Sequence, residues 1–441
     1  MLEAAGALLT MLGDSMIPEA YTRAVCRDPA DVSNLRNMNM NVNVYTQFGL
    51  EPIINVAGTS TRVGGPLMHP AAARAMVDAA GACVALDQLQ GAASRIIAEA
   101  TGAEAGYVTA GAAAGLTLSA AACLARLDVA VMDRLPETSG LPNEIVISRE
   151  QRNGYDHALR AAGAQLVEVG MNELVAGAGV RRTEVWEYDA AITDRTVAVA
   201  YFANPDSAPP VEEVAALCKQ RGVPLIVDAA GQLPPAANLR RFVDAGADLV
   251  TFSGGKGLRG PQSSGILAGR RDLIMSVALQ QLDLDEHWSI WDPPHHLIDR
   301  AKLRGFPRHG IGRGFKVARE EIVALLVALR CFVAGDYRQD ILRCDAYLHS
   351  LADGLLGVRG VKAHFLGGID EDRFPVLELA LDEATLGLTA FEVSRRLRAG
   401  KPAVYVNESR LQQGVLILHA LGLEERLLEP LTQRLREVLG G

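Results

Sequence analysis

Residues 253–265 have the sequence SGGKGLRGPQSSG and directly follow DLVTF at residues 248–252. DLVTF is short and rich in apolar and β-branched residues, which predicts a buried strand. The glycines that follow predict a tight loop whose backbone can lie close to a ligand. Lys256 in such a loop can reach into a cleft, where its amine can form an imine with an aldehyde cofactor. A tight turn with a solvated lysine is the alternative, and the loop alone does not exclude it.

A carboxylate upstream of this lysine loop favours the cofactor interpretation. The sequence VPLIVDAAGQLPP, residues 223–235, places Asp228 at the C-terminal end of another apolar strand, the edge at which open α/β sheets bind ligands. A buried carboxylate needs a partner, and a protonated pyridine nitrogen suits it because opposite charges stabilise each other. The protonated ring then acts as an electron sink. Asp228 as a helix cap is the alternative, but Asp228 together with Lys256 is more specific than either residue alone.

A run of small residues predicts where an anion binds. Residues 108–115 have the sequence VTAGAAAG and lead into an alanine-rich segment. Small residues let the N–H groups at a helix start approach an anion, and the helix dipole favours negative charge there. A small-residue helix packed closely on a sheet explains the segment equally well. The residues expected at the cofactor phosphate are Thr109, Ala110, Gly111, Ala112 and Ala113, with the hydroxyl of Ser253.

Strand-like and helix-like segments alternate along the first two thirds of the chain. Further strands are expected at residues 144–148, 165–169, 197–202 and 223–228, and helices at residues 156–162 and 211–220. Apolar strands that alternate with helices are typical of a mostly parallel α/β sheet. The uncharged, Ala- and Gly-rich residues 105–125 are long enough to span a bilayer, but their composition favours a helix buried against this sheet.

The pattern changes after about residue 310. Amphipathic helices are expected at residues 320–333 and 424–439, with a few short strands between them, which predicts a smaller α+β domain. We therefore expect three parts in this chain of 441 residues. They are an N-terminal extension at residues 1–44, which includes a short apolar helix, a large domain at residues 45–310 and a small C-terminal domain at residues 311–441.

Bulk properties exclude several classes of protein. The formal net charge is −9, which disfavours binding to nucleic acid because that needs a basic surface. Six cysteines are scattered without a CxxC pair, which argues against a disulfide framework or a zinc site. No Lys or Arg precedes Arg23, so the basic region of a signal peptide is missing. We expect a cytoplasmic enzyme with reduced thiols and no membrane segment.

The three motifs, in this order, resemble fold-type I pyridoxal 5'-phosphate (PLP) enzymes. The nearer resemblance is to the selenocysteine synthase-like group, which includes D-glucosaminate-6-phosphate ammonia-lyases. The stretches that carry it lie at residues 54–70, 147–170, 226–235, 245–265 and 310–329. The resemblance implies an aspartate-aminotransferase-like fold, with a mostly parallel sheet of the seven-stranded type and a smaller α+β C-terminal domain. It also implies PLP as the cofactor.

The resemblance assigns roles to the residues already singled out. It implies that Lys256 holds PLP as a Schiff base and that Asp228 pairs with the pyridine nitrogen. The turn at residues 109–113 and Ser253 resemble the phosphate cup. His157 or Tyr155 is a candidate for stacking on the cofactor ring, although His157 as an ordinary surface residue of a helix is equally well supported.

Several polar residues resemble a substrate site. Thr59, Ser60 and Arg62 resemble a substrate loop near the domain interface, and Arg259, Arg313 and Lys316 are cations that can bind an anionic substrate or the phosphate. Most such cations are simply solvated. Fold-type I active sites usually lie at a dimer interface, so a homodimer or a higher homo-oligomer is expected. Residues 310–316 are the candidate segment that reaches a neighbouring subunit.

Two further patterns are weaker. GIGRG at residues 310–314 contains GxGxG without the strand, turn, helix and acidic residue of a dinucleotide site. Acidic and histidine residues crowd residues 283–296, but their irregular spacing in a Pro-rich context favours a solvated loop or the rim of the active site over a metal site. No metal is expected.

The reaction is the least determined part of the prediction, because fold alone does not select a chemistry. The favoured class is α,β-elimination with ammonia release from a small, polar, anionic amino acid or amino sugar acid, with Lys256 as the general base. Selenium transfer to seryl-tRNA is the alternative. The net charge, and an N-terminal extension shorter than the corresponding domain of the resembled enzyme, disfavour it. A non-enzymatic PLP-fold protein, a racemase, an aldolase or an aminotransferase also remain open.

Overall fold

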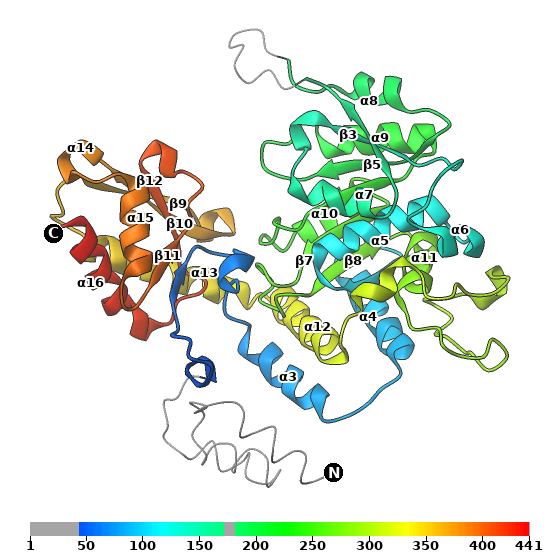
Figure 1. The fold of residues 1–441 in the computed structure, drawn as a ribbon, viewed down its shortest axis with the longest axis horizontal. Helices are drawn as coiled ribbons and strands as arrows, with labels where there is room; N and C mark the ends of the chain where they lie inside the picture. The colour runs from blue at the N-terminus through cyan, green and yellow to red at the C-terminus, as the bar shows by residue number, and fades with distance from the viewer. Residues whose placement is uncertain (1–43, 172–180, 441) are drawn as a thin grey trace, which may run out of the picture.

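The computed structural model describes residues 44–171 and 181–440 (Figure 1). The expected N-terminal extension and its short helix lie outside these residues except for Val44. Two bodies of unequal size are connected through α13 (Tyr337–Gly354). The large one is built on a wide sheet and the small one on a narrow sheet.

The large body contains a seven-stranded sheet with the order β2-β8-β7-β6-β5-β3-β4. Its strands are β2 (Ala105–Thr109), β3 (Glu144–Ser148), β4 (Gln165–Val169), β5 (Thr196–Phe202), β6 (Leu225–Asp228), β7 (Leu249–Ser253) and β8 (Gly265–Gly269). The five strands from β7 to β4 are mutually parallel, while β8 is antiparallel to both of its neighbours. The sheet is therefore mostly parallel, which confirms the predicted fold class.

Helices cover both faces of this sheet. They are α4 (Leu86–Thr101), α5 (Gly111–Ala125), α6 (Val129–Arg134), α7 (His157–Ala161), α8 (Val185–Ala191), α9 (Val211–Arg221), α10 (Asn238–Asp244), α11 (Arg271–Gln281) and α12 (Arg319–Val333). The helix α3 (Pro70–Ala80) packs against α12. Alternate residues of one strand enter opposite cores. In β3, Val146 belongs to the buried core that also includes residues of α4, α8, α9, α10 and α12, whereas Ile145 and Ile147 belong to the core that includes residues of α5, α6, α7 and α11. Successive side chains of a strand point to opposite faces of the sheet, so apolar residues on both faces hold the strand between two layers of helices.

The small body combines a three-stranded antiparallel sheet with helices. Its sheet has the order β12-β10-β9, formed by β9 (Val361–Gly368), β10 (Arg373–Leu381) and β12 (Val415–His419). Its remaining elements are α13, α14 (Glu383–Leu386), α15 (Ala390–Ala399), β11 (Val404–Val406) and α16 (Leu428–Leu439).

Short 3₁₀ turns occur along the whole described chain. They lie at Val44–Phe48, Thr61–Val63, Arg149–Gln151, Gly154–Asp156, Arg300–Lys302, Ile311–Phe315, Ile369–Glu371, Leu411–Gln413 and Glu425–Leu427.

Two segments cross the expected domain boundaries. β1 (Ile54–Val56) pairs in parallel with β11, and its residues Ile54 and Val56 are buried in the core of the small body. In the other direction, α12 packs against α3 and α4, and its Ile322 and Leu325 join a core of the large sheet. The division at residues 44 and 310 stays a proposal, and these contacts are the observations that bear on it.

The alanine-rich segment differs from its expectation. The uncharged residues 105–125 are not one helix, because β2 takes the first five residues and α5 begins at Gly111. Short apolar runs of small residues have no period that separates strand from helix. Within residues 44–171 and 181–440, every helix falls short of the length and apolar character that a membrane crossing requires.

Candidate active site

The lysine loop leaves the sheet at the end of β7 and returns as β8. Hydrogen bonds across the loop close it, from Gly254 N–H to the Ser264 carbonyl at 2.9 Å and from Gly260 N–H to the Gly254 carbonyl at 2.8 Å. A Cβ on Gly255 would lie 2.5 Å from Cα of Gln262, so the two arms of the loop meet too closely for any side chain there. Lys256 is partly exposed in this compact loop.

Asp228 is the last residue of β6, beside β7. It lies opposite Thr251 of β7 and is partly buried. Among the described residues, the Ala230 N–H donates a hydrogen bond of 2.9 Å to Oδ1 of Asp228. Burial raises the pKa of the Asp228 carboxyl, while this N–H and the Lys256 ammonium act in the opposite direction. The site therefore holds a carboxylate that a further positive partner would stabilise.

Lys256 and Asp228 share one edge of the sheet. The Lys256 charge acts on the carboxyl of Asp228. The amine of Lys256 also lies above the segment that follows β6, because a Cβ on Gly231 would be only 3.9 Å from Nζ. This edge, at the C-terminal ends of the parallel strands, is where α/β folds bind ligands.

The predicted phosphate residues also gather at this edge. Thr109 and Ser253 are both register partners of Gly265, so the ends of β2 and β7 flank the start of β8. Gly111 opens α5 with a φ of 85°, which favours glycine. The Thr109 hydroxyl donates to the Gly111 carbonyl at 2.8 Å, and no side chain of the described residues caps the N-terminal N–H groups of α5. An anion is a fitting partner for such N–H groups.

Gly265 permits this close approach. A Cβ at this position would lie 2.5 Å from the carbonyl carbon of Gly111 and 2.7 Å from the backbone nitrogen of Ala112. We expect Gly265→Ala to displace the first turn of α5 at a cost of about 1–3 kcal/mol, and to weaken PLP binding about tenfold or more. Equilibrium dialysis of PLP measures the effect. Gly305→Ala is the matched control, since no atom lies within 4 Å of a Cβ there, and equal PLP affinity in the two variants would contradict the prediction.

The candidates for ring stacking lie beside α5. His157 begins α7 and is exposed, and its Nδ1 lies 3.5 Å from Nη2 of Arg160. The Thr117 hydroxyl of α5 donates to the carbonyl of Ala158 at 2.9 Å, so α7 is fixed against the second turn of α5. Tyr155 is exposed in the preceding 3₁₀ turn. His157 thus begins a helix that packs against α5, and its stacking role stays a prediction.

The predicted substrate loop connects the two bodies. Thr59 and Ser60 are partly buried and follow β1, which belongs to the small body. The loop contacts the lysine loop through the side-chain amide of Gln262, which donates to the Thr61 hydroxyl at 3.0 Å. Sequence reasoning missed Gln262 because it lies within the lysine motif itself and its partner is distant in the chain.

Arg62 forms an ion pair at the surface of the small body. Its Nη2 lies 3.1 Å from Oε2 of Glu408, and about half of its side chain is exposed. Arg398 also contacts Glu408, and both guanidinium groups lie over the ring of Tyr405. Two arginines thus share one carboxylate near the substrate loop.

Arg259 lies in the lysine loop but points elsewhere. It is buried, with Nη1 2.6 Å from Oδ2 of Asp340 in α13, and its Nε donates to the carbonyl of Leu67 at 2.9 Å. Its charge is therefore already paired. In this structure Arg259 connects the lysine loop to the helix that leads into the small body.

Arg313 and Lys316 lie around a separate cavity of about 190 Å³. Arg313 contacts Asp283, and Lys316 is exposed. The cavity is lined by Leu86, Gln90, Gln281, Leu282, Asp283, Arg313, Lys316, Val317 and Ile322. Neither Lys256 nor Asp228 is among these residues, so the candidate site does not line this cavity.

The residues at the sheet edge fit PLP. Asp228 is a carboxylate whose pKa is raised by burial, Lys256 supplies an amine at the same edge whose charge acts on that carboxyl, and the α5 terminus offers N–H groups in a cradle that a Cβ at Gly265 would fill. Sequence reasoning missed Gly231 and Gly265. The signal in the sequence that pointed to such close packing is the small-residue triplet that ends at each glycine, AAG at Gly231 and SSG at Gly265.

Comparison with known proteins places this geometry in context. A family model described as L-seryl-tRNA selenium transferase matches residues 53–285, more than half of the chain. A 5'-C-glycyluridine monooxygenase-decarboxylase from Streptomyces sp is 32% identical over 400 residues, which cover 90% of this chain and 92% of that protein. A D-glucosaminate-6-phosphate ammonia lyase from Salmonella typhimurium is 28% identical over 411 residues, which cover 90% and 98%.

Other matches are shorter or structural. The L-seryl-tRNA(Sec) selenium transferase of Serratia proteamaculans is 32% identical over 263 residues, 53% of this chain and 51% of that protein. A solved structure of D-glucosaminate-6-phosphate ammonia-lyase has a TM-score of 0.74 and 27% identity, covering 91% of this chain and 99% of that chain. A structure of SPT with PLP, at a TM-score of 0.50 and 13% identity over 88% and 87% of the two chains, is alike in fold alone.

Proposed function

This chain belongs to the L-seryl-tRNA selenium transferase family of PLP-dependent enzymes, and from this premise we propose that it is a lyase. The reaction is α,β-elimination with release of ammonia from a small, polar, anionic amino acid or amino sugar acid. Lys256 at the same sheet edge as Asp228 supports PLP chemistry at this site. The observation that carries the choice of a lyase is the likeness to D-glucosaminate-6-phosphate ammonia lyase along nearly the whole chain.

Each residue at the sheet edge has one task in this proposal. PLP supplies an electron-withdrawing ring that stabilises negative charge at the substrate's α-carbon. Lys256 would hold the cofactor through Nζ and would accept the proton of the substrate's α-carbon. Asp228 would favour a proton on the pyridine nitrogen. Thr109, Ser253 and the first N–H groups of α5 would bind the phosphate.

Arg62 is the proposed contact for the anionic group of the substrate. It projects from the loop that joins the lysine loop to the small body, and it shares Glu408 with Arg398. We expect Arg62→Ala to raise KM for an anionic substrate about tenfold, because a charge-assisted hydrogen bond contributes about 1.5–3 kcal/mol. For a neutral analogue the KM should change little.

A substitution of Glu408, the ion-pair partner of Arg62, provides the control. Glu408→Gln removes the ion pair but keeps the arginine, so it should leave KM for the anionic substrate unchanged or lower it. Steady-state kinetics on both substrates separate the two effects. Equal rises of KM for the anionic and the neutral substrate in Arg62→Ala would assign Arg62 a purely structural task.

A second candidate is oxygen-dependent decarboxylation. The Streptomyces relative is named a monooxygenase-decarboxylase, and its 32% identity extends over 90% of this chain. Both candidates use the same cofactor and the same sheet edge, so the site residues alone do not separate them. The products do separate them, since one reaction releases ammonia without oxygen and the other consumes O₂ and releases CO₂.

Selenium transfer to a tRNA has less support. The matches to the selenium transferases cover about half of this chain and half of those proteins. A net charge of −9 is also unfavourable for a ligand with a dense row of phosphates. Any affinity for seryl-tRNA should be non-specific at physiological salt.

One side-by-side assay tests the proposed function. The holoenzyme is incubated with a panel of amino acids and amino sugar acids, with and without O₂, and separately with seryl-tRNA and a selenium donor. Ammonia and a 2-oxo acid formed without O₂ support the lyase. CO₂ release that requires O₂ would favour the second candidate, and turnover of the tRNA alone would overturn both.

We further propose that the active enzyme is a homo-oligomer whose residues 310–316 act at a neighbouring subunit. Arg313 and Lys316 lie in a cavity apart from Lys256 of their own chain. If each site needs both subunits, mixing inactive Lys256→Ala and Arg313→Ala proteins under exchange conditions should restore up to about a quarter of wild-type activity, by random pairing in a dimer. Activity of mixed samples that stays at the level of the separate variants would contradict this.

We also propose a cytoplasmic location. The five described cysteines, Cys83, Cys123, Cys218, Cys331 and Cys344, are all free thiols. Free thiols are usual in a reducing compartment.

A further inference from the structure

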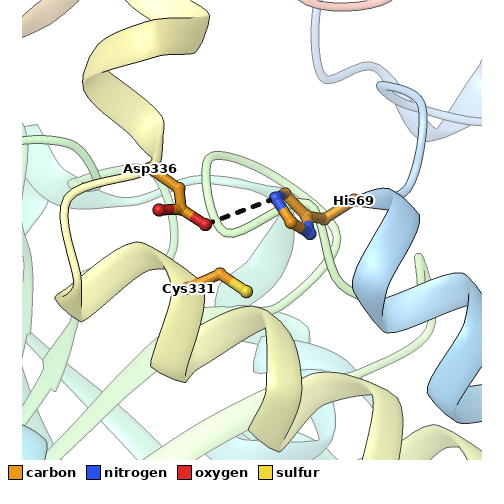
Figure 2. A group of neighbouring side chains, drawn as sticks. All are labelled: His69, Cys331 and Asp336. Atoms are coloured by element: carbon orange, nitrogen blue, oxygen red, sulfur yellow. Dashed lines mark ion pairs between the residues drawn. The ribbon is translucent and has the colours of Figure 1, made fainter.

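Three side chains of different chemistry meet at the junction of the two bodies. His69 precedes α3, Cys331 lies in the last turn of α12, and Asp336 precedes α13 (Figure 2). Their imidazole, thiol and carboxylate groups each offer one ligand atom, and these atoms all lie within 4.8 Å of one another. The sequence predicted no metal site, because His69 is far along the chain from the other two residues.

The donor set and its spacing suit zinc. Imidazole nitrogen, thiolate sulfur and carboxylate oxygen are the three protein ligands of Zn²⁺. A tetrahedral zinc ion with bonds of about 2.0–2.3 Å holds its ligand atoms about 3.3–3.6 Å apart. Nε2 of His69 lies 3.8 Å from Oδ2 of Asp336, so small side-chain movements are enough. We propose that His69, Cys331 and Asp336 form a zinc-binding site made of residues outside the proposed catalytic set.

The surroundings leave room for one ion. A cavity of about 10 Å³ adjoins the three residues, close to the volume that a single water-sized occupant needs. Its walls include Gly257, Leu258 and the buried Arg259 of the lysine loop, and the charge of Arg259 is paired with Asp340. Half of the Asp336 side chain is exposed, so an ion can enter from solvent and a water molecule can complete the coordination.

The protons balance on binding. Burial is the main cause that lowers the pKa of His69, so its imidazole is neutral at pH 7. Its Nδ1 accepts a long hydrogen bond of 3.3 Å from the Ala71 N–H, which places the ring proton on Nε2. Zinc at Nε2 shifts that proton to Nδ1 and breaks this bond. The Cys331 thiol, whose pKa is raised by burial and by Asp336, releases its proton to solvent, and the two anionic ligands neutralise Zn²⁺.

The position of the site connects it to the lysine loop. The N–H of His69 donates to the carbonyl of Arg259 at 2.7 Å, and the N–H of Arg259 donates to the carbonyl of Lys256 at 3.0 Å. Asp336 directly precedes α13, which leads into the small body. Zinc bound here would therefore fix α13 to α3 and, through the backbone of His69, to the loop that carries Lys256.

Metal binding to the holoenzyme tests the proposal. The protein is treated with a chelator, dialysed against Zn²⁺ and analysed for metal content. One zinc ion per chain is expected, with a melting temperature raised by several degrees when Zn²⁺ is in hundredfold excess over its Kd. Co²⁺ in place of Zn²⁺ should give a thiolate-to-cobalt absorption band and the visible bands of a tetrahedral ion, which lie apart from the absorption of PLP.

Matched variants assign the ligands. Cys331→Ser should lower zinc affinity at least tenfold and remove the thiolate band, and Asp336→Asn should lower the affinity similarly. His69→Asn removes the imidazole but keeps a side-chain acceptor for the start of α3, so a loss of zinc in this variant does not follow from a lost helix cap. Cys83→Ser is the control, because Cys83 is an exposed thiol outside this group. A wild-type protein that binds no zinc, or Cys331→Ser protein that binds it as tightly as Cys83→Ser protein, overturns the proposal.

Discussion

Lys256→Ala is expected to reduce turnover by at least about 10³-fold, because one substitution removes both the proposed attachment point of the cofactor and the proposed general base. The closed loop between β7 and β8, and the effect of the Lys256 charge on Asp228, support this proposal. The variant should also lose the absorption band that borohydride removes from the wild-type protein. Steady-state kinetics and absorption spectra measure the two effects.

Mass spectrometry after borohydride reduction gives the direct test of this assignment. The pyridoxyl group should be found on Lys256 of the wild-type protein. Lys302→Ala is the control, since this exposed lysine is paired with Asp299 and lies outside the candidate site. A pyridoxyl group on another lysine, or substantial turnover by Lys256→Ala, would show that the site has been misidentified.

Asp228→Asn is expected to have the second largest effect, a fall in kcat of about 10²–10⁴-fold. Asparagine keeps the shape of the side chain but no longer favours a proton on the pyridine nitrogen, so the ring stabilises negative charge less well. The fold should survive, because Oδ1 of the asparagine can still accept the hydrogen bond from Ala230. Near-wild-type turnover in this variant would remove Asp228 from its proposed role.

The stability of the same variant provides an independent check. Burial raises the pKa of Asp228 in the folded protein, so the folded state binds its proton more tightly than the unfolded state. The contribution of Asp228 to the free energy of unfolding is therefore complete below the pKa that it has in the unfolded state. This contribution is lost as the pH rises through the pKa that it has in the folded state. At neutral pH, the cofactor-free Asp228→Asn protein should then unfold at the same or a higher denaturant concentration than the cofactor-free wild type.

The strands with β-branched residues could be predicted from the sequence almost to the residue. Residues 144–148 and 165–169 were expected as strands and form β3 and β4. β2 and β8 were not predicted, because their sequences AGYVT and GILAG are short and rich in small residues. Only pairing across the sheet decides that they are strands, and pairing between distant segments leaves no periodic signal in either one.

The candidate site also has a part that could be predicted from the sequence and a part that could not. The sequence pattern indicated two strands that end at the same edge of the sheet, and this places Lys256 and Asp228 near each other. The environments of the arginines do not follow from local sequence. Arg259 is paired with Asp340 and Arg62 with Glu408, and each partner comes from a distant segment. A cation in a polar loop gives no sign of which carboxylate it will meet.

The parallel pairing of β1 with β11 has a consequence for biosynthesis. During translation, Ile54 and Val56 leave the ribosome long before Val404 and Val406, their partners in the sheet. The segments that build the seven-stranded sheet all emerge in between, and domains tend to fold as they emerge. The nascent chain therefore carries an apolar segment without its partner until the last part has been made. Premature termination anywhere before residue 404 would leave that segment exposed, which makes truncated chains targets for chaperones and proteases.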